Sequence, residues 1–160
     1  MLLFAHVGIA LASARFFSHV SLAFLALGSM LPDIIDKPLG LIVFGSPSMG
    51  RTVAHTLLFL MLLSALSFYF RDIRLFSLTL GVLIHLSLDF IWNSPETLLW
   101  PLLGPFPGVP LQDTMSYLQL LLSGLKNTGI LIPEIAGLAY LIFFAYVERK
   151  QASSWIGHQW

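Results

Sequence analysis

The sequence predicts an all-α integral membrane protein with about five transmembrane helices, a re-entrant or interfacial segment and an amphipathic interfacial helix. Apolar residues make up 57% of its 160 residues, and charged residues only 10%. The mean hydropathy is +0.85. Both values depart from those of soluble proteins. The apolar residues also fall into five segments, most of them near the roughly 20 residues that cross a bilayer as a helix.

Short polar stretches separate these segments. We predict helices at about residues 2–14, 16–31, 51–70, 75–92 and 130–147. Arg15 lies in the turn between the first two, and the charged residues 71–74 separate the third from the fourth. Pro32 and the polar residues 33–37 are expected to end the second helix.

Two further stretches are predicted not to span the membrane. The prolines and glycines of residues 38–47 indicate a loop or a re-entrant piece. In residues 111–126 apolar side chains recur at helical spacing among polar ones, which is typical of a helix lying in the interface. Residues 1–150 are thus expected to form one membrane domain, and residues 151–160 a short polar tail.

The positive charges predict an orientation in the cell (inner) membrane. Threading the five helices alternately places five basic residues on one side, Arg15, Arg71, Arg74, Arg149 and Lys150, and three on the other, Lys37, Arg51 and Lys126. The richer side is expected to be cytoplasmic, together with the C-terminus. We expect the first helix to be retained, because no positive region precedes it.

Composition excludes several classes of function. Eight basic and eight acidic residues give a formal net charge of +0, so no electrostatic surface for nucleic acid is expected. The expected partner is a membrane lipid or a lipid-linked substrate. Cysteine is absent, so any metal must bind to His, Asp or Glu. Neither an H-E-x-x-H helix nor a G-x-S-x-G turn is present.

Eight ionisable residues map to one leaflet, the outer one in this orientation. Each costs about 2.5–3.5 kcal/mol to insert, so their presence in apolar segments usually marks a function. His85 and Asp89 are four residues apart and share a helix face, as do Arg51 and His55. The full set is His6, Asp33, Asp36, Arg51, His55, His85, Asp89 and Glu134.

Crowded carboxylates in such surroundings repel each other unless a cation compensates them. The imidazoles and carboxylates suit one or two divalent ions, Zn²⁺ first and Mn²⁺ or Fe²⁺ as alternatives. Arg51 is expected to bind phosphate. Glu134 is a candidate base or simply an interfacial acid. His19 lies about 21 Å along the helix from Asp33 and is expected to be structural.

The order of these motifs resembles the YdjM-like membrane-bound metal-dependent hydrolases. The resemblance is carried by His6, Leu-Pro-Asp-Ile-Ile-Asp at 31–36, Arg-Thr-Val-Ala-His-Thr at 51–56, His-Leu-Ser-Leu-Asp at 85–89 and Leu-Trp-Pro at 99–101. It implies a polytopic hydrolase, distantly similar to zinc-dependent phospholipase C. The implied metal ligands are His6, Asp33, Asp36, His55, His85 and Asp89. The chain departs from the family pattern in the extra residue between Asp33 and Asp36, and in Thr56 where serine is common.

The leading hypothesis is a membrane-embedded metal-dependent hydrolase that cleaves a phosphoester or related ester of a lipid or lipid-linked substrate. Two alternatives remain at this point. One is a non-enzymatic metal-binding membrane protein, such as a transporter or an accessory factor. The other is an intramembrane metal-dependent amide hydrolase.

Overall fold

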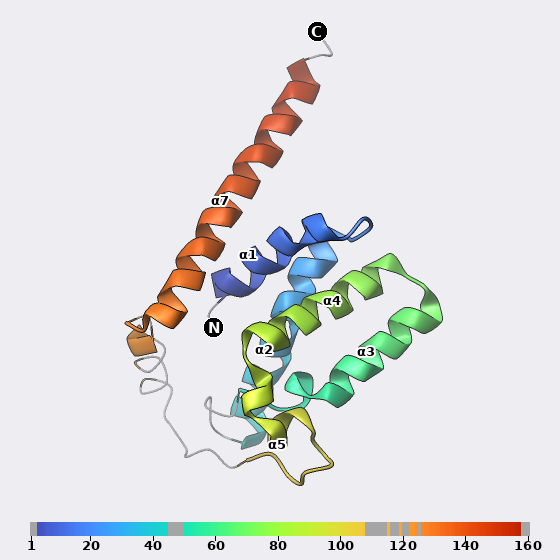
Figure 1. Ribbon diagram of the computed structural model, residues 1–160, viewed down its shortest axis with the longest axis vertical. Helices are drawn as coiled ribbons and strands as arrows, with labels where there is room; N and C mark the ends of the chain where they lie inside the picture. Colours follow the sequence, from blue (N-terminus) through green and yellow to red (C-terminus); the bar gives the residue numbers. More distant parts are fainter. Residues whose placement is uncertain are drawn as a thin grey trace.

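A computed structural model describes residues 3–44, 50–107, 115, 119, 122–124 and 126–157 (Figure 1). Within these residues the chain is helical and contains no strand, which confirms the all-α prediction. The longer helices are α1 (Leu3–Ser13), α2 (Leu22–Phe44), α3 (Leu57–Phe70), α4 (Ile73–Leu88) and α7 (Thr128–Gly157). The short ones are η1 (Ala14–Phe16), η2 (Val53–His55), η3 (Ile91–Asn93) and α5 (Pro95–Leu98).

Each predicted apolar segment corresponds to a helix, but several boundaries differ from the prediction. Helix α2 begins at Leu22 and not at 16, α3 begins at Leu57 and not at 51, and α7 extends to Gly157. Helix α2 does not stop at Pro32 and continues through Pro38 to Phe44. Within the continuation, Lys37 forms an ion pair with Asp33 one turn earlier, with Nζ and Oδ2 2.7 Å apart, which supports the helix. The predicted loop therefore does not begin at Pro38. Residues 45–49 and most of 111–126 lie outside the described residues.

The prediction of five spans is not confirmed. Among the described helices, one stretch, Thr128–Val147 of α7, is long and apolar enough to cross a membrane. Helices α1, α3 and α4 are apolar but have 11, 14 and 16 residues. At 1.5 Å per residue they measure about 16–24 Å, which is less than a hydrocarbon core of about 30 Å.

The pair α2 and α4 forms the centre of the molecule and is in close backbone contact. A Cβ atom on Gly81 would lie 2.4 Å from the Leu25 carbonyl oxygen, and one on Gly28 would lie 2.1 Å from that of Leu78. Only glycine permits this approach. Helix α3 packs on α4, and its side chains contribute to a small core around Val82. The close pairing fixes the end of α4 beside the middle of α2.

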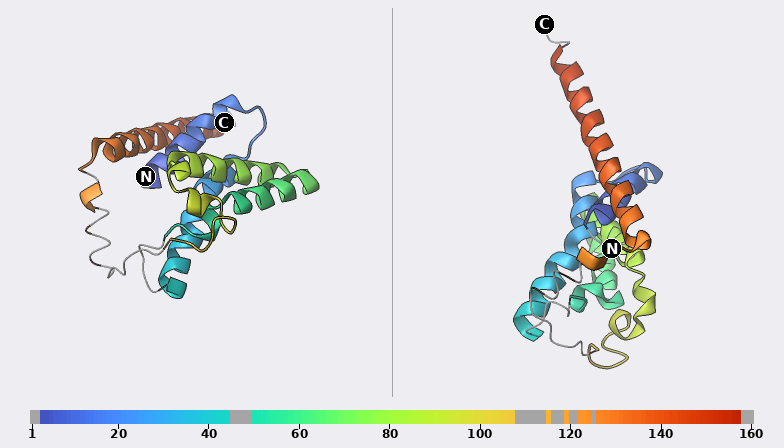
Figure 2. Two further views of the ribbon diagram at one scale, coloured as in Figure 1. Left: turned by 60° about the horizontal axis from the view of Figure 1, so that its bottom comes forward. Right: turned by 90° about the vertical axis from the view of Figure 1, so that its left-hand side faces the viewer.

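Helices α1 and α7 lie side by side and run parallel (Figures 1 and 2). The Phe4 amide donates to Glu134 Oε2 at 3.0 Å, and the Tyr140 hydroxyl donates to the Leu11 carbonyl oxygen at 3.4 Å. Residues later in α1 therefore contact residues later in α7, as parallel helices do. A parallel pair is also what alternate threading of the five predicted segments requires. Beyond this contact α7 projects away from the other helices (Figure 1).

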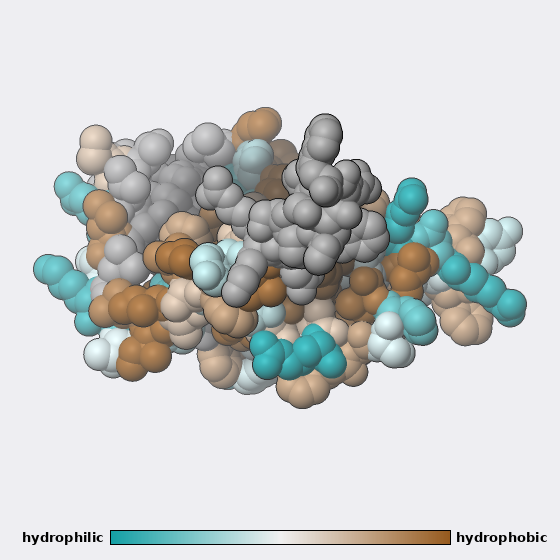
Figure 3. All heavy atoms as spheres, turned by 90° about the horizontal axis from the view of Figure 1, so that it is seen from above, coloured by the Kyte–Doolittle hydropathy of each residue, from teal (hydrophilic) through white to brown (hydrophobic). Residues whose placement is uncertain are grey.

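Large apolar side chains cover much of the described surface. Phe16, Phe68 and Leu102 are more than 80% exposed. Figure 3 shows apolar colours on several parts of the face seen from above, with hydrophilic side chains in separate groups. Such a surface is suited to an apolar environment rather than to water.

Candidate metal centre

Four helical regions bring the ionisable residues together, although they are far apart in the sequence. His6 comes from α1, and Asp33 and Asp36 come from the middle of α2. Arg51 precedes η2, and His55 ends it. His85 lies in the last turn of α4, and Asp89 is its C-cap. His6, Asp36, His55 and His85 are at most 2% exposed, so this is an enclosed polar cluster.

Asp36 holds His55 in place. One carboxylate oxygen, Oδ2, accepts from His55 Nδ1 at 2.7 Å, from the Thr52 amide at 2.6 Å and from the His55 amide at 3.2 Å. The other, Oδ1, accepts from the Ala54 amide at 2.9 Å. The carboxylate thus organises η2, which is why α3 begins at Leu57 and not at residue 51. Asp36, predicted as a metal ligand, lies behind His55, on the side opposite the cluster.

His85 is held in a similar way by a backbone group. Its Nδ1 donates to the Ser29 carbonyl oxygen at 2.7 Å, since a carbonyl oxygen can only accept. The proton on Nδ1 leaves a lone pair on Nε2, and the same reasoning applies to His55. The two Nε2 atoms face each other at 3.2 Å. Two facing lone pairs at this distance repel unless a cation or a proton lies between them.

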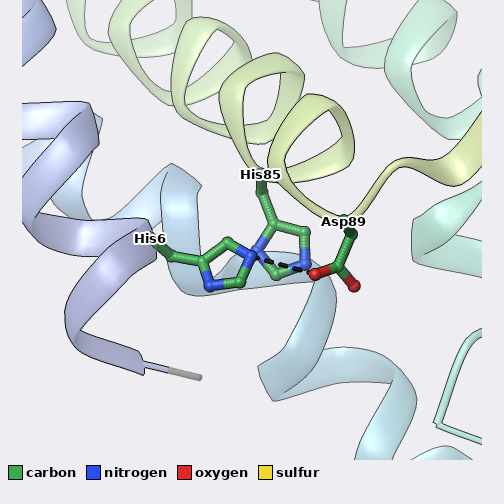
Figure 4. A group of neighbouring side chains, drawn as sticks. All are labelled: His6, His85 and Asp89. Atoms are coloured by element: carbon green, nitrogen blue, oxygen red, sulfur yellow. Dashed lines mark hydrogen bonds and ion pairs between the residues drawn. The ribbon is translucent and has the colours of Figure 1, made fainter. Parts of the chain in front are cut away.

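His6, His85 and Asp89 lie close together (Figure 4). The His6 ring stacks on that of His85, with centroids 4.2 Å apart. Its Nε2 donates to Asp89 Oδ1 at 3.2 Å. Arg51 Nη2 donates to Asp89 Oδ2 at 2.8 Å. The Arg51 side chain is 44% exposed and that of Asp89 only 7%, so Arg51 covers the cluster from its accessible side.

Two groups of side chains could hold a metal ion. One comprises His6, His85 and Asp89, and the other Asp33, His55 and His85; in each the possible ligand atoms lie within 4.8 Å of one another. Ligands at about 2.0–2.1 Å in a tetrahedral zinc site are about 3.3 Å apart. The 3.2 Å between the Nε2 atoms of His55 and His85 matches this value. The 3.2 Å between His6 Nε2 and Asp89 Oδ1 matches it too, and an ion there would replace the proton that the two atoms share. The donor set therefore fits a divalent ion.

Asp33 is the most accessible member of the two groups. Its side chain is 25% exposed and is paired with Lys37 through Oδ2. The other oxygen, Oδ1, lies 3.9 Å from His55 Nε2. The Lys37 partner could have been expected from the spacing of four residues on a helix.

Glu134 lies apart from both groups. It is 6% exposed and accepts from the Phe4 amide at the start of α1, while its second oxygen has no hydrogen-bond partner among the residues that the structure describes. The carboxylate therefore contacts the helix that carries His6, not the imidazoles themselves. Sequence reasoning missed the Ser29 carbonyl oxygen, because a backbone acceptor leaves no signal in the residue type.

Comparison with known proteins gives one family match. The YdjM inner membrane protein family matches residues 1–155, almost the whole chain. No curated protein and no solved structure matches the chain. The matched range includes the cluster and the motifs on which the resemblance was based. The chain therefore belongs to the YdjM inner membrane protein family.

Proposed function

We propose that this protein is a metal-dependent hydrolase of the inner membrane that cleaves a phosphoester or related ester of a lipid or lipid-linked substrate. The observation that carries the proposal is the pair of Nε2 atoms of His55 and His85, which face each other at 3.2 Å while both Nδ1 atoms donate elsewhere. This arrangement presents two lone pairs to one point, as a metal site does.

The proposed ligands are His6, Asp33, His55, His85 and Asp89. Asp36 and the Ser29 carbonyl oxygen orient two of the imidazoles from behind. Such outer partners fix the tautomer of a ligating histidine and raise its basicity. Zn²⁺ is the leading candidate, because buried imidazole and carboxylate groups suit it, and Mn²⁺ or Fe²⁺ would accept the same donors.

The charges of the cluster also favour a divalent cation. Asp33, Asp36 and Asp89 bring three negative charges. Arg51 and Lys37 bring two positive ones, both from side chains that are nearly half exposed. The carboxylates of Asp36 and Asp89 are buried, and a buried charge is costly unless a cation compensates it. A bound divalent ion would remove that cost, polarise a phosphoryl or carbonyl oxygen, and make a water molecule acidic near neutral pH.

Arg51 is proposed to bind the phosphoryl group. Its guanidinium reaches Asp89 with Nη2, yet the side chain remains 44% exposed. A planar guanidinium can hold a carboxylate and a phosphoryl oxygen on different donors. Arg51 therefore stands between the cluster and an entering substrate. Glu134 is proposed to fix the start of α1, and through it His6, instead of acting as a base.

We further propose that the cluster faces the outer side of the membrane and that the C-terminus is cytoplasmic, as the distribution of basic residues favours. The chain has no cysteine, so one introduced cysteine can be labelled without background. Asp72→Cys, in the turn between α3 and α4, is expected to react only after the membrane is permeabilised. Labelling of intact cells would reverse the orientation.

The hydrolase proposal is tested on purified, zinc-loaded protein with a mixed pool of membrane lipids and lipid-linked phosphates, with products identified by mass spectrometry. His85→Ala and Asp89→Ala should lose both zinc and turnover. Arg51→Ala should keep zinc and lose about tenfold or more in turnover of phosphorylated substrates, because a hydrogen bond to a charged group is worth about 1.5–3 kcal/mol. Arg51→Lys should recover part of the loss.

His19→Ala is the control, since His19 is exposed in the turn before α2 and lies outside both groups. Its zinc content and turnover should equal those of the wild type. Zinc binding without metal-dependent loss of any lipid would favour the non-enzymatic metal-binding protein. Release of a fatty acid from an amide, with phosphoesters intact, would favour the amide hydrolase.

A further inference from the structure

An apolar groove of about 570 Å³ runs between α3 and α4 and contains none of the residues of the metal cluster. Leu60 and Phe68 line it from α3, and Phe76, Leu80 and Leu83 from α4. The turn that joins the two helices, at Arg71, lies at one end. Its volume lies within the range of roughly 300–1,000 Å³ that is usual for ligand sites.

The shape of the groove suits one hydrocarbon chain. It follows α4 from Ile73 to Leu83, a rise of about 15 Å at 1.5 Å per residue. Three hydroxyl-bearing residues line the groove, Ser64, Ser67 and Thr79. Ser64 donates to the Leu60 carbonyl oxygen at 2.7 Å and Thr79 to that of Leu75 at 2.8 Å, and Ser67 is only 8% exposed. The walls therefore present mainly apolar surface to a ligand.

Two charged residues, Arg71 and Asp72, line the end of the groove at the turn. Asp72 is engaged as the N-cap of α4, with Oδ1 accepting from the amides of Arg74 and Leu75. Arg71 is the C-cap of α3, and its amide donates to the Ser67 carbonyl oxygen. Its guanidinium makes no hydrogen bond or ion pair with the residues that the structure describes. An exposed positive group that is not engaged in a cap thus lies at this end of the apolar groove.

We propose that this groove binds one anionic membrane phospholipid, with the phosphate at Arg71 and an acyl chain between α3 and α4. The chain belongs to an inner membrane family, so phospholipid is available at this surface. Basic residues at the ends of membrane helices attract anionic lipid headgroups. The proposal does not depend on the hydrolase function, because the groove and the cluster share no residue.

The test is native mass spectrometry of the delipidated full-length protein in detergent, titrated separately with phosphatidylglycerol and with phosphatidylcholine of the same acyl chains. The wild type should bind one phosphatidylglycerol about fivefold more tightly than phosphatidylcholine, the effect of one basic group near an anionic headgroup. Arg71→Gln should lose this preference, and Arg71→Lys should keep it. Arg15→Gln is the matched control, since Arg15 lies outside the groove and over the Tyr140 ring.

A second pair of variants tests the acyl chain. Ser64→Phe places a large side chain on the groove wall at an exposed position and should weaken binding of both lipids. Leu62 is exposed on α3 but does not line the groove. The Leu62→Phe variant should therefore bind both lipids like the wild type. Equal affinities of the wild type for the two lipids, equal effects of Arg71→Gln and Arg15→Gln, or unchanged binding in Ser64→Phe would each overturn the proposal.

Discussion

Replacing Asp36 by asparagine tests whether Asp36 orients the metal ligand His55 or is itself a metal ligand. The asparagine oxygen can take the place of Oδ2 and keep its three hydrogen bonds, but the amide nitrogen then faces the Ala54 amide, another donor. One hydrogen bond and the negative charge behind His55 are lost. Loss of an outer partner typically lowers metal affinity by about 10–100-fold, or about 1.4–2.8 kcal/mol. The unpaired buried donors should also lower the free energy of unfolding by about 1–3 kcal/mol.

The assay is competition between Asp36→Asn protein and a fluorescent zinc chelator, with thermal unfolding measured on the same sample. Asp72→Asn is the control, because Asp72 caps α4 and asparagine caps a helix equally well. Zinc affinity equal to that of the wild type would refute the orienting role. A folded variant with no measurable zinc binding, like His85→Ala, would show that Asp36 is itself a ligand.

Three further predictions concern stability and the role of Glu134. Gly81→Leu should lower the free energy of unfolding, measured by thermal melting, by about 1–3 kcal/mol or more, because its Cβ would meet the α2 backbone. Gly124→Leu is the control and should leave the free energy of unfolding unchanged, because a Cβ there has one contact, at 3.6 Å. Zinc at one hundred times its dissociation constant should stabilise the wild type by about 2.7 kcal/mol, and an unchanged melting temperature would contradict a metal site in the folded protein. Glu134→Gln should change turnover less than about fivefold, since it alters a helix-terminal charge worth about 0.3–1 kcal/mol; complete loss of turnover with zinc retained would make Glu134 catalytic.

Which ionisable residues come together could be predicted from the sequence better than where the helices begin and end. The spacing of four residues places His85 and Asp89 on one side of α4, and the structure has them in one group of possible ligands. Helix periodicity alone is enough for such a pair.

The role of Asp36 could not be predicted in the same way. It depends on the amides of Thr52 and Ala54, which reach the carboxylate only because η2 interrupts the start of the predicted third helix. Prolines at 32 and 38 indicated a break in α2, yet α2 continues. A proline removes one amide donor from a helix, and tertiary contacts on both sides of Pro32 compensate for that local cost. The packing that decides this is not visible in the residue types.

The shared position of His85 limits how many ions the cluster can take up with full ligation. Its Nδ1 is committed to the Ser29 carbonyl oxygen, so a neutral ring has one lone pair to give. Both groups of possible ligands include this ring. Occupation of one group therefore withdraws the nitrogen from the other, and the two positions compete for the same imidazole. If two ions were bound, one of them would have only two of these side chains as ligands, either His6 and Asp89 or Asp33 and His55. That ion would be bound more weakly and would exchange first.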